Sequence, residues 1–246
     1  MQKKTHRANW LDFLRGLALV LMIIYHTLWD LEHLFGRTIP WFTDSRALLL
    51  ERIICFSFIL ISGYSIGLSR HGIRKGVIVF ASGILVSVVT YFFVPDSIII
   101  FGILTFLGVA MILTTLLKSQ LNHMTPIIGA LVFFILFLLF YRVNQGQLGF
   151  LGFPIATFSG SLYKNYVTTF FGFPFPGFYS TDYFSFLPWI FLYFVGYYLY
   201  LLTQRFAKKS FGPIRKWGLI SFLGRYTLPI YLIHQIIIYG VMYFIF

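Results

Sequence analysis

Residues 11–34 read LDFLRGLALVLMIIYHTLWDLEHL. This run is long enough to cross the hydrocarbon core of a bilayer, which takes about 20 mostly apolar residues in a helix. A cleavable signal peptide has a shorter apolar stretch and a small-residue cleavage site after it, whereas this run is long and carries Asp12 and Arg15. The pattern therefore predicts a helix that stays in the membrane.

Six further runs along the chain have the same length and apolar character. Buried strands would also be rich in Phe, Leu, Ile and Val, but these runs are too long for barrel strands and lack a period of two. We therefore expect an all-α, polytopic membrane helix bundle in a single domain, 1–246, with about seven transmembrane helices. The expected spans are residues 11–34, 47–69, 76–95, 97–117, 124–141, 184–203 and 220–244.

The composition agrees with this fold class. Of 246 residues, 59% are hydrophobic and only 11% are charged, whereas about a quarter of the residues of a soluble domain are charged. The low charge also excludes a disordered chain, and a lone Cys55 cannot form an intrachain disulfide. We expect Cys55 to be a small buried apolar residue. The bilayer is thus the first partner that the sequence predicts.

The excess of basic residues predicts an orientation. Nineteen Lys and Arg against seven acidic residues give a net charge of +12, which in a membrane protein reflects cytoplasmic loops and not a nucleic acid partner. With the N-terminus inside, the four external cations are Arg37, Arg46, Arg142 and Lys164. The twelve cytoplasmic ones are Lys3, Lys4, Arg7, Arg70, Arg74, Lys75, Lys118, Arg205, Lys208, Lys209, Arg215 and Lys216. We expect a cell-membrane protein with a cytoplasmic N-terminus and an external C-terminus.

One long connection, residues 142–182, does not fit a simple bundle. It is rich in Gly, Phe, Pro and Tyr and lies outside in this orientation. It could form a lid, a re-entrant segment or a short interfacial helix. A further span within it would place the cations of 205–216 outside, which disfavours that alternative.

Polar side chains line one face of the first helix. At about 100° per residue, five of them fall within a sector of roughly 60°. Charged groups inside a span are costly and usually face the bundle interior or a water-filled cavity, so they indicate function. The five residues are Asp12, Arg15, His26, Asp30 and His33.

The order of these groups suggests a reaction path. Arg15 lies near the cytoplasmic end, about 16 Å from His26 at 1.5 Å per residue, and its guanidinium can hold a phosphate. Asp30 follows His26 by one turn, a spacing that lets a carboxylate fix the imidazole tautomer for general-base work. The alternative is structural: Asp12 and Arg15 form an ion pair at the helix end, and His26 bonds a neighbouring helix.

The last span carries a second imidazole, His234, beside Gln235, with Arg225 nearer its cytoplasmic end. Nine residues separate Arg225 from His234, which places them on opposite faces of a regular helix. Pro229 lies between them and could change that relation. For His234, packing between helices and a catalytic role are both open.

Other polar and aromatic side chains collect on the external side. Arg52 and Asp182 could build a polar pocket there. Trp189 offers a ring face for a sugar, or serves in an interfacial aromatic belt.

Several of these segments together resemble a known family. Arg7, then LDFLRGLA at 11–18, MIIYH at 22–26 and Asp30 followed by Leu31 resemble the opening signature of bacterial relatives of the heparan-alpha-glucosaminide N-acetyltransferase catalytic domain, within the transmembrane acyltransferases. The spacing of Arg15 and His26 is also similar to the basic-x10-His motif of acyltransferases that modify surface polysaccharides. Further similar segments are FGIL at 101–104, DYF at 182–184, LPW at 187–189, LGR at 223–225 and YLIHQ at 231–235.

This resemblance implies an enzyme that moves an acyl group, favouring acetyl, from cytosolic acyl-CoA to an extracytoplasmic glycan or amino sugar. Acyl-CoA would be a co-substrate, with no permanently bound cofactor and no metal. His26, Asp30 and His234 would be catalytic, and Arg52, Asp182 and Trp189 would bind the acceptor. The residues expected to hold acyl-CoA are Arg15, Asp12, Arg70, Arg74, Lys75 and Arg225.

Two other functions remain open at this stage. In a proton-coupled transporter or flippase of a small molecule or lipid-linked sugar, Asp12, His26 and Asp30 would form a proton relay. In a noncatalytic membrane partner, Arg15 and His26 would be dispensable. A homo-oligomer is compatible with either function and with the enzyme.

Overall fold

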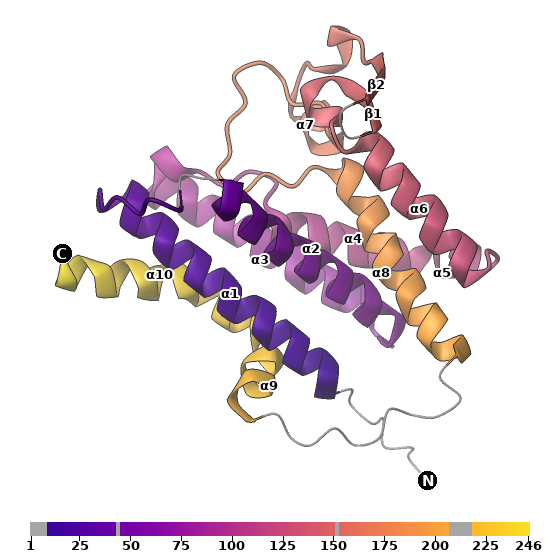
Figure 1. Ribbon diagram of the computed structural model, residues 1–246, viewed down its shortest axis with the longest axis horizontal. Coiled ribbons are helices and arrows are strands. Elements are labelled where there is room, and N and C mark those ends of the chain that lie inside the picture. The colour runs from indigo at the N-terminus through magenta and orange to yellow at the C-terminus, as the bar shows by residue number, and fades with distance from the viewer. Residues whose placement is uncertain (1–8, 43–44, 151–152, 207–217) are drawn as a thin grey trace. The chain divides into compact units, whose positions relative to one another are not determined.

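The computed structural model describes residues 9–42, 45–150, 153–206 and 218–246 of the chain. These residues are mostly helical (Figure 1), so the expected all-α membrane bundle is confirmed. Their contacts form two compact units, Met1–Ile61 with Ala207–Phe246, and Ser62–Phe206. The single-domain assignment stays a prediction.

Six of the described helices are long and apolar enough to cross a membrane. They correspond to six of the seven expected spans. Their bounds are α1 (Asn9–His33), α2 (Ser45–Gly67), α3 (Gly72–Phe93), α6 (Pro126–Phe140, which a short turn extends to Gln145), α8 (Phe186–Phe206) and α10 (Thr227–Ile245).

The fourth expected span, 97–117, is shorter than predicted. Its helix, α4 (Ile103–Leu116), has 14 residues and is about 21 Å long, against about 30 Å of hydrocarbon. The residues before it, 98–102, are not helical and pair with residues 181–184: Thr181 N–H donates to the Ile98 carbonyl at 3.1 Å, and Phe184 N–H donates to the Phe101 carbonyl at 2.9 Å. Because the loop satisfies these backbone groups, this stretch need not be helical.

The last expected span, 220–244, is broken into two helices. Helix α9 (Gly218–Arg225) ends before Tyr226, and α10 begins at Thr227. Pro229 explains the position of the break, because a proline ring inside a helix clashes with the carbonyl four residues earlier, at Arg225. In the first turn of α10 the missing N–H of Pro229 costs nothing. The opposite-face relation of Arg225 and His234 therefore does not hold.

The first unit is built on α1. Leu19 and Met22 of α1 and Ile54 of α2 form its buried core, to which α9 and α10 add Leu223, Ile230 and Tyr231. Helices α1 and α10 lie side by side (Figure 1). This unit contains every residue of the polar face of α1.

Two glycines let α1 and α9 touch through their backbones. A Cβ atom on Gly224 would lie 1.6 Å from the carbonyl oxygen of Asp12, and one on Gly16 would lie 1.9 Å from that of Ile220. No side chain fits at either position. Each glycine has an arginine beside it in sequence, Arg15 and Arg225, so the close approach brings both guanidinium groups to one place.

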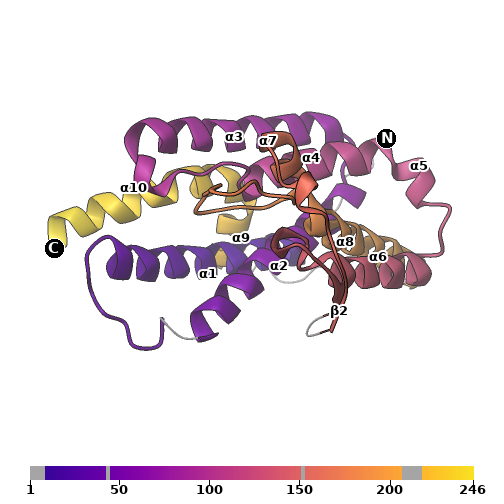
Figure 2. The same ribbon diagram turned by 90° about the horizontal axis from the view of Figure 1, so that it is seen from above.

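The second unit pairs α3 with α4 and α6 with α8 (Figure 2). Glycines again allow the first contact, because a Cβ on Gly83 or Gly108 would meet the backbone of Thr105 or Phe80 at 2.5 Å. In the second contact, the ring of Phe133 packs against those of Phe194 and Tyr198, with centroids 4.9 and 5.6 Å apart.

The connection 142–182 contains a hairpin that the sequence did not predict. Strands β1 (Gln147–Phe150) and β2 (Phe153–Thr157) pair antiparallel, and the six-residue helix α7 (Tyr166–Phe171) follows. Asn165 begins α7 with a capping box. A helix of six residues cannot cross a membrane, so the disfavoured additional span is not found among the described residues of this connection.

The described residues leave the expected orientation as a prediction. Seven of the twelve cations that favour it, Lys3, Lys4, Arg7, Lys208, Lys209, Arg215 and Lys216, lie outside the described residues.

The α1–α9 contact predicts that no side chain is tolerated at Gly224. We expect Gly224→Ala to separate the two helices and to lower the free energy of unfolding by about 1–3 kcal/mol, as overpacking does. Thermal unfolding in detergent measures this loss. Gly240→Ala in α10 is the matched control, because no heavy atom lies within 4 Å of its Cβ position; equal melting of the two variants would contradict the packing described here.

Candidate functional site on helices α1, α9 and α10

A buried carboxylate anchors one end of the site. Asp12 is 1% exposed, and its Oδ1 accepts a hydrogen bond of 3.1 Å from Arg15 Nη1. Its Oδ2 lies 3.5 Å from Nε of Arg225 on α9. A buried charge needs such partners to offset its desolvation. The ion pair of Asp12 and Arg15, which the structural alternative expected, is therefore present, and Arg225 joins it.

The two arginines also reach solvent. Their side chains are 30% and 44% exposed, for Arg15 and Arg225. One carboxylate between two guanidinium groups leaves a net positive charge at this end of α1. Guanidinium groups are the side chains best suited to phosphate, which they bind through paired N–H donors.

His26 lies eleven residues further along α1. Its Nδ1 is 2.9 Å from the carbonyl oxygen of Met22. A carbonyl can only accept a hydrogen bond, so Nδ1 carries the proton and donates it. In the neutral ring Nε2 is then the basic nitrogen.

His234 of α10 faces His26 within this unit. The two ring centroids are 4.9 Å apart, with the rings inclined at 75°. His234 is buried, and its Nδ1 hydrogen-bonds the Tyr231 carbonyl. Its Nε2 is buried without a hydrogen-bond partner among the described residues. The structure thus brings together the two imidazoles that the sequence placed on separate helices.

Asp30 has a different partner from the one expected. The sequence predicted that its carboxylate would orient His26, but the Met22 carbonyl does so. Asp30 is completely buried and accepts two hydrogen bonds of 2.8 Å, one on each oxygen, from Nε2 of Gln235. The reason is steric: the His26 ring bends back toward the preceding turn, as helical side chains do, and so turns away from the residue that follows it.

Gln235 is the residue whose role sequence reasoning missed. Its place beside His234 in the sequence does not by itself indicate a function. A usable signal existed, because a buried carboxylate in a span needs a donor and Gln235 is one of the few polar residues of the last span. Its bond to Asp30 ties α10 to α1 next to the two imidazoles.

The other predicted phosphate-binding cations lie in the second unit. Arg70, Arg74 and Lys75 are exposed around the start of α3. Their part in binding acyl-CoA stays a prediction.

The predicted acceptor-binding residues divide between the units. Arg52 is an exposed residue of α2 in the first unit. In the second unit, Asp182 accepts a 3.0 Å hydrogen bond from the Ile103 N–H and so caps α4. Trp189 packs against Phe184 and Phe137, with centroids 5.1 and 5.7 Å apart. The structure shows packing and capping roles for Asp182 and Trp189, and acceptor binding stays a prediction.

Tyr183, the neighbour of Asp182, binds the backbone of the connection 142–182. Its hydroxyl donates to the Thr169 carbonyl at 2.5 Å. Burial raises the pKa of this phenol above its ordinary value, so the group stays protonated and keeps this bond across the physiological pH range.

Cys55 is partly buried in α2. Among the described residues, no group of three or more His, Cys, Asp or Glu side chains could hold a metal ion.

Comparison with known proteins identifies the family. No curated protein matches the chain, and no solved structure does. The family model described as heparan-alpha-glucosaminide N-acetyltransferase, catalytic, matches residues 7–236. The match covers most of the chain and includes Asp12, Arg15, His26, His234 and Gln235. With six apolar helices of membrane-spanning length among its described residues, the chain is a multi-pass membrane protein that belongs to the heparan-alpha-glucosaminide N-acetyltransferase catalytic-domain family, whose members are membrane acetyltransferases.

Proposed function

We propose that this protein transfers an acetyl group from acyl-CoA to a glycan or amino-sugar acceptor, with His26 as the general base. The observation that carries this proposal is the contact between the His26 and His234 rings, whose centroids are 4.9 Å apart. His26 lies on α1, the helix that also holds Arg15. A base and a phosphate-binding group thus share one rigid element. The family supports acetyl transfer in general, and the donor, the acceptor and the base are the proposed part.

The nucleotide and phosphate groups of acyl-CoA bind at Arg15 and Arg225 in this proposal. Asp12 holds both guanidinium groups in place, and these partly exposed groups donate to phosphate oxygens. The thioester then has to reach His26, about 16 Å further along α1. The extended pantetheine arm of the donor covers this distance along the helix pair.

The chemical step follows from the tautomer of His26. Its basic Nε2 takes the proton from the acceptor N–H or O–H as that atom attacks the thioester carbonyl carbon. The tetrahedral intermediate collapses with cleavage of the C–S bond, and the departing thiolate takes the proton from the imidazolium. The products are the acetylated acceptor and CoA. His234, whose Nε2 has no partner among the described residues, adds a second imidazole next to the reacting atoms.

Asp30 and Gln235 act as positioning residues in this scheme. Their hydrogen bonds fix α10 against α1, and His234 precedes Gln235 directly in sequence. The distance between the two imidazoles therefore depends on this contact.

We also propose the direction of transfer. The distribution of Lys and Arg places the N-terminus, Arg15 and the acyl-CoA entry on the cytoplasmic side of the cell membrane. The same charge rule assigns Arg70, Arg74 and Lys75, which are exposed around the start of α3, to the cytoplasmic side, where they would add positive charge for the donor. The acceptor is then extracytoplasmic.

Loss of the base should abolish turnover. We expect His26→Ala to lower kcat for acetyl transfer by about 10²–10⁴-fold, the usual contribution of a general base, with thermal unfolding close to wild type. The measurement is release of CoA and acetylation of glucosamine by the purified protein. The control is His123→Ala, an exposed histidine beyond α5 (Lys118–Leu121). Undiminished transfer by His26→Ala would contradict the role of His26, and acceptor uptake without CoA release would support the transporter hypothesis.

The phosphate role of Arg15 can be separated from its structural role. We expect Arg15→Gln to lower kcat/KM for acetyl-CoA by about 10–100-fold, because a charge-assisted hydrogen bond contributes about 1.5–3 kcal/mol. The loss should lie mainly in KM. With S-acetylpantetheine, which lacks the phosphates, the variant and wild type should be equal.

Arg205→Gln, at an exposed cation near the end of α8, is the matched control for charge. An equal loss with both donors would contradict phosphate binding by Arg15 and would assign the effect to its ion pair with Asp12.

A further inference from the structure

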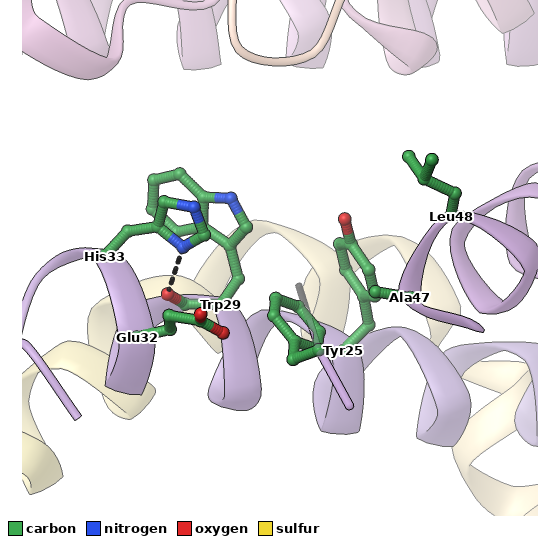
Figure 3. Close-up of a pocket in the computed structure, with 7 residues that line it drawn as sticks. Tyr25, Trp29, Glu32, His33, Ala47 and Leu48 are labelled. Atoms are coloured by element: carbon green, nitrogen blue, oxygen red, sulfur yellow. Dashed lines mark hydrogen bonds between the residues drawn. The ribbon is translucent and has the colours of Figure 1, made fainter. Parts of the chain in front are cut away.

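A cavity of about 300 Å³ lies at the other end of α1, within the first unit. One side of it is lined by residues from successive turns of α1, namely Tyr25, Trp29, Glu32 and His33 (Figure 3). Phe42 and, at the start of α2, Ala47 and Leu48 line the rest of it, and it is open on one side. A volume of this size holds a single small ligand and is at the lower end of natural binding sites.

The walls of this cavity are aromatic and ordered by direct contacts. The rings of Trp29 and His33 are stacked, with centroids 4.6 Å apart and planes inclined by 6°, and His33 Nδ1 donates to the Trp29 carbonyl at 3.1 Å (Figure 3). The Tyr25 ring packs against Phe42 at 5.3 Å. Such fixed ring faces attract a cation through their quadrupoles and also suit the apolar face of a small ring.

One acidic residue is among the described residues that line the cavity. Glu32 lines it, and one of the Glu32 carboxylate oxygens is buried without a hydrogen-bond partner among the described residues. A second acid, Glu51, accepts a 3.2 Å hydrogen bond from the hydroxyl of Tyr25. The nearby cations Arg46 and Arg52 are not among the lining residues. A buried carboxylate that lacks a donor favours a ligand that brings one, and a cationic donor offsets its charge as well.

We infer that this cavity binds an organic ammonium group, with Glu32 as its anionic partner and the rings of Tyr25, Trp29 and Phe42 as its cation-binding walls. The inference rests on the proposed function, because it makes the cavity a subsite for the acceptor. Tyr25 links the two sites: its ring is also in edge contact with His26, with centroids 5.8 Å apart.

The position of Glu32 shows which part of an acceptor it holds. Glu32 follows His26 by six residues, a rise of about 9 Å along the helix, and lies on a different face. The ammonium at Glu32 is therefore not the group that reacts at His26. An acceptor that occupies both places at once therefore carries a second amine, about 9 Å along the helix from the nucleophile. Glucosamine, with one amine, probes the Glu32 place when no donor is present.

Equilibrium binding tests this inference without any acetyl transfer. The purified full chain in phosphatidylglycerol nanodiscs is titrated with glucosamine and with glucose, its neutral counterpart, by calorimetry in the absence of acyl-CoA. We expect wild type to bind glucosamine at least tenfold more tightly than glucose. Glu32→Gln, which keeps the shape and removes the charge, should abolish this preference.

Two further variants complete the test. Asp96→Asn removes an exposed carboxylate near the end of α3 and should bind like wild type. Trp29→Leu should weaken glucosamine binding while Glu32 remains. Equal binding of glucosamine by wild type and Glu32→Gln, or equal binding of glucose and glucosamine by wild type, would overturn the ammonium site.

An ammonium group could also come from a lipid headgroup. Phosphatidylethanolamine added to the nanodiscs distinguishes the two sources. If the lipid weakens glucosamine binding to wild type, and this effect is lost in Glu32→Gln, the site binds a lipid headgroup. If the lipid does not weaken glucosamine binding, the site binds a soluble acceptor. Because binding is measured without a donor, failure of the ammonium site leaves acetyl transfer intact. Failure of acetyl transfer, in turn, leaves the preference for glucosamine in place.

Discussion

The site depends on one contact, the pair of hydrogen bonds from the Gln235 amide to both oxygens of Asp30. Inside a span, where water is scarce, a carboxylate without a donor is costly, and the cost is relieved only while α10 lies against α1. The position of His234 follows, because it is the residue before Gln235. The two imidazoles face each other as a consequence of satisfying a buried acid.

A backbone contact sets the other end of the helix pair. Gly16 and Gly224 allow α1 and α9 to approach until only backbone atoms lie between them, and the arginine beside each glycine then reaches Asp12. Two buried carboxylates on one helix are thus satisfied in different ways, Asp12 by guanidinium groups and Asp30 by an amide. At Asp12, where phosphate is to be bound, two guanidinium groups surround one carboxylate. Next to the imidazoles, where proton transfer is proposed, a neutral amide binds the carboxylate of Asp30.

Much of this arrangement follows from the sequence. Apolar length predicts six of the helices, and the 3.6-residue period predicts that Asp12, Arg15, His26 and Asp30 share a face of α1. Helix geometry cannot predict the partner of Asp30, because that choice depends on which helix packs there and in what register. The break at Tyr226 could not be predicted for a related reason. Pro229 indicates a kink, but whether a helix bends or ends there depends on what its ends can contact.

The hairpin of 147–157 has short strands and a weak pattern, and the cavity at Glu32 needs residues from α1 and from the segment that leads into α2. Neither has a local signal.

The central claim is that acyl-CoA lies along α1, with its phosphates at Arg15 and Arg225 and its sulfur at the two imidazoles. An experimental structure of the protein with CoA bound tests this most directly. The account predicts density for phosphate groups within hydrogen-bond distance of both guanidinium groups, and the thiol beside Nε2 of His26. Density for CoA that contacts neither arginine, or a thiol directed away from His26 and His234, would contradict it.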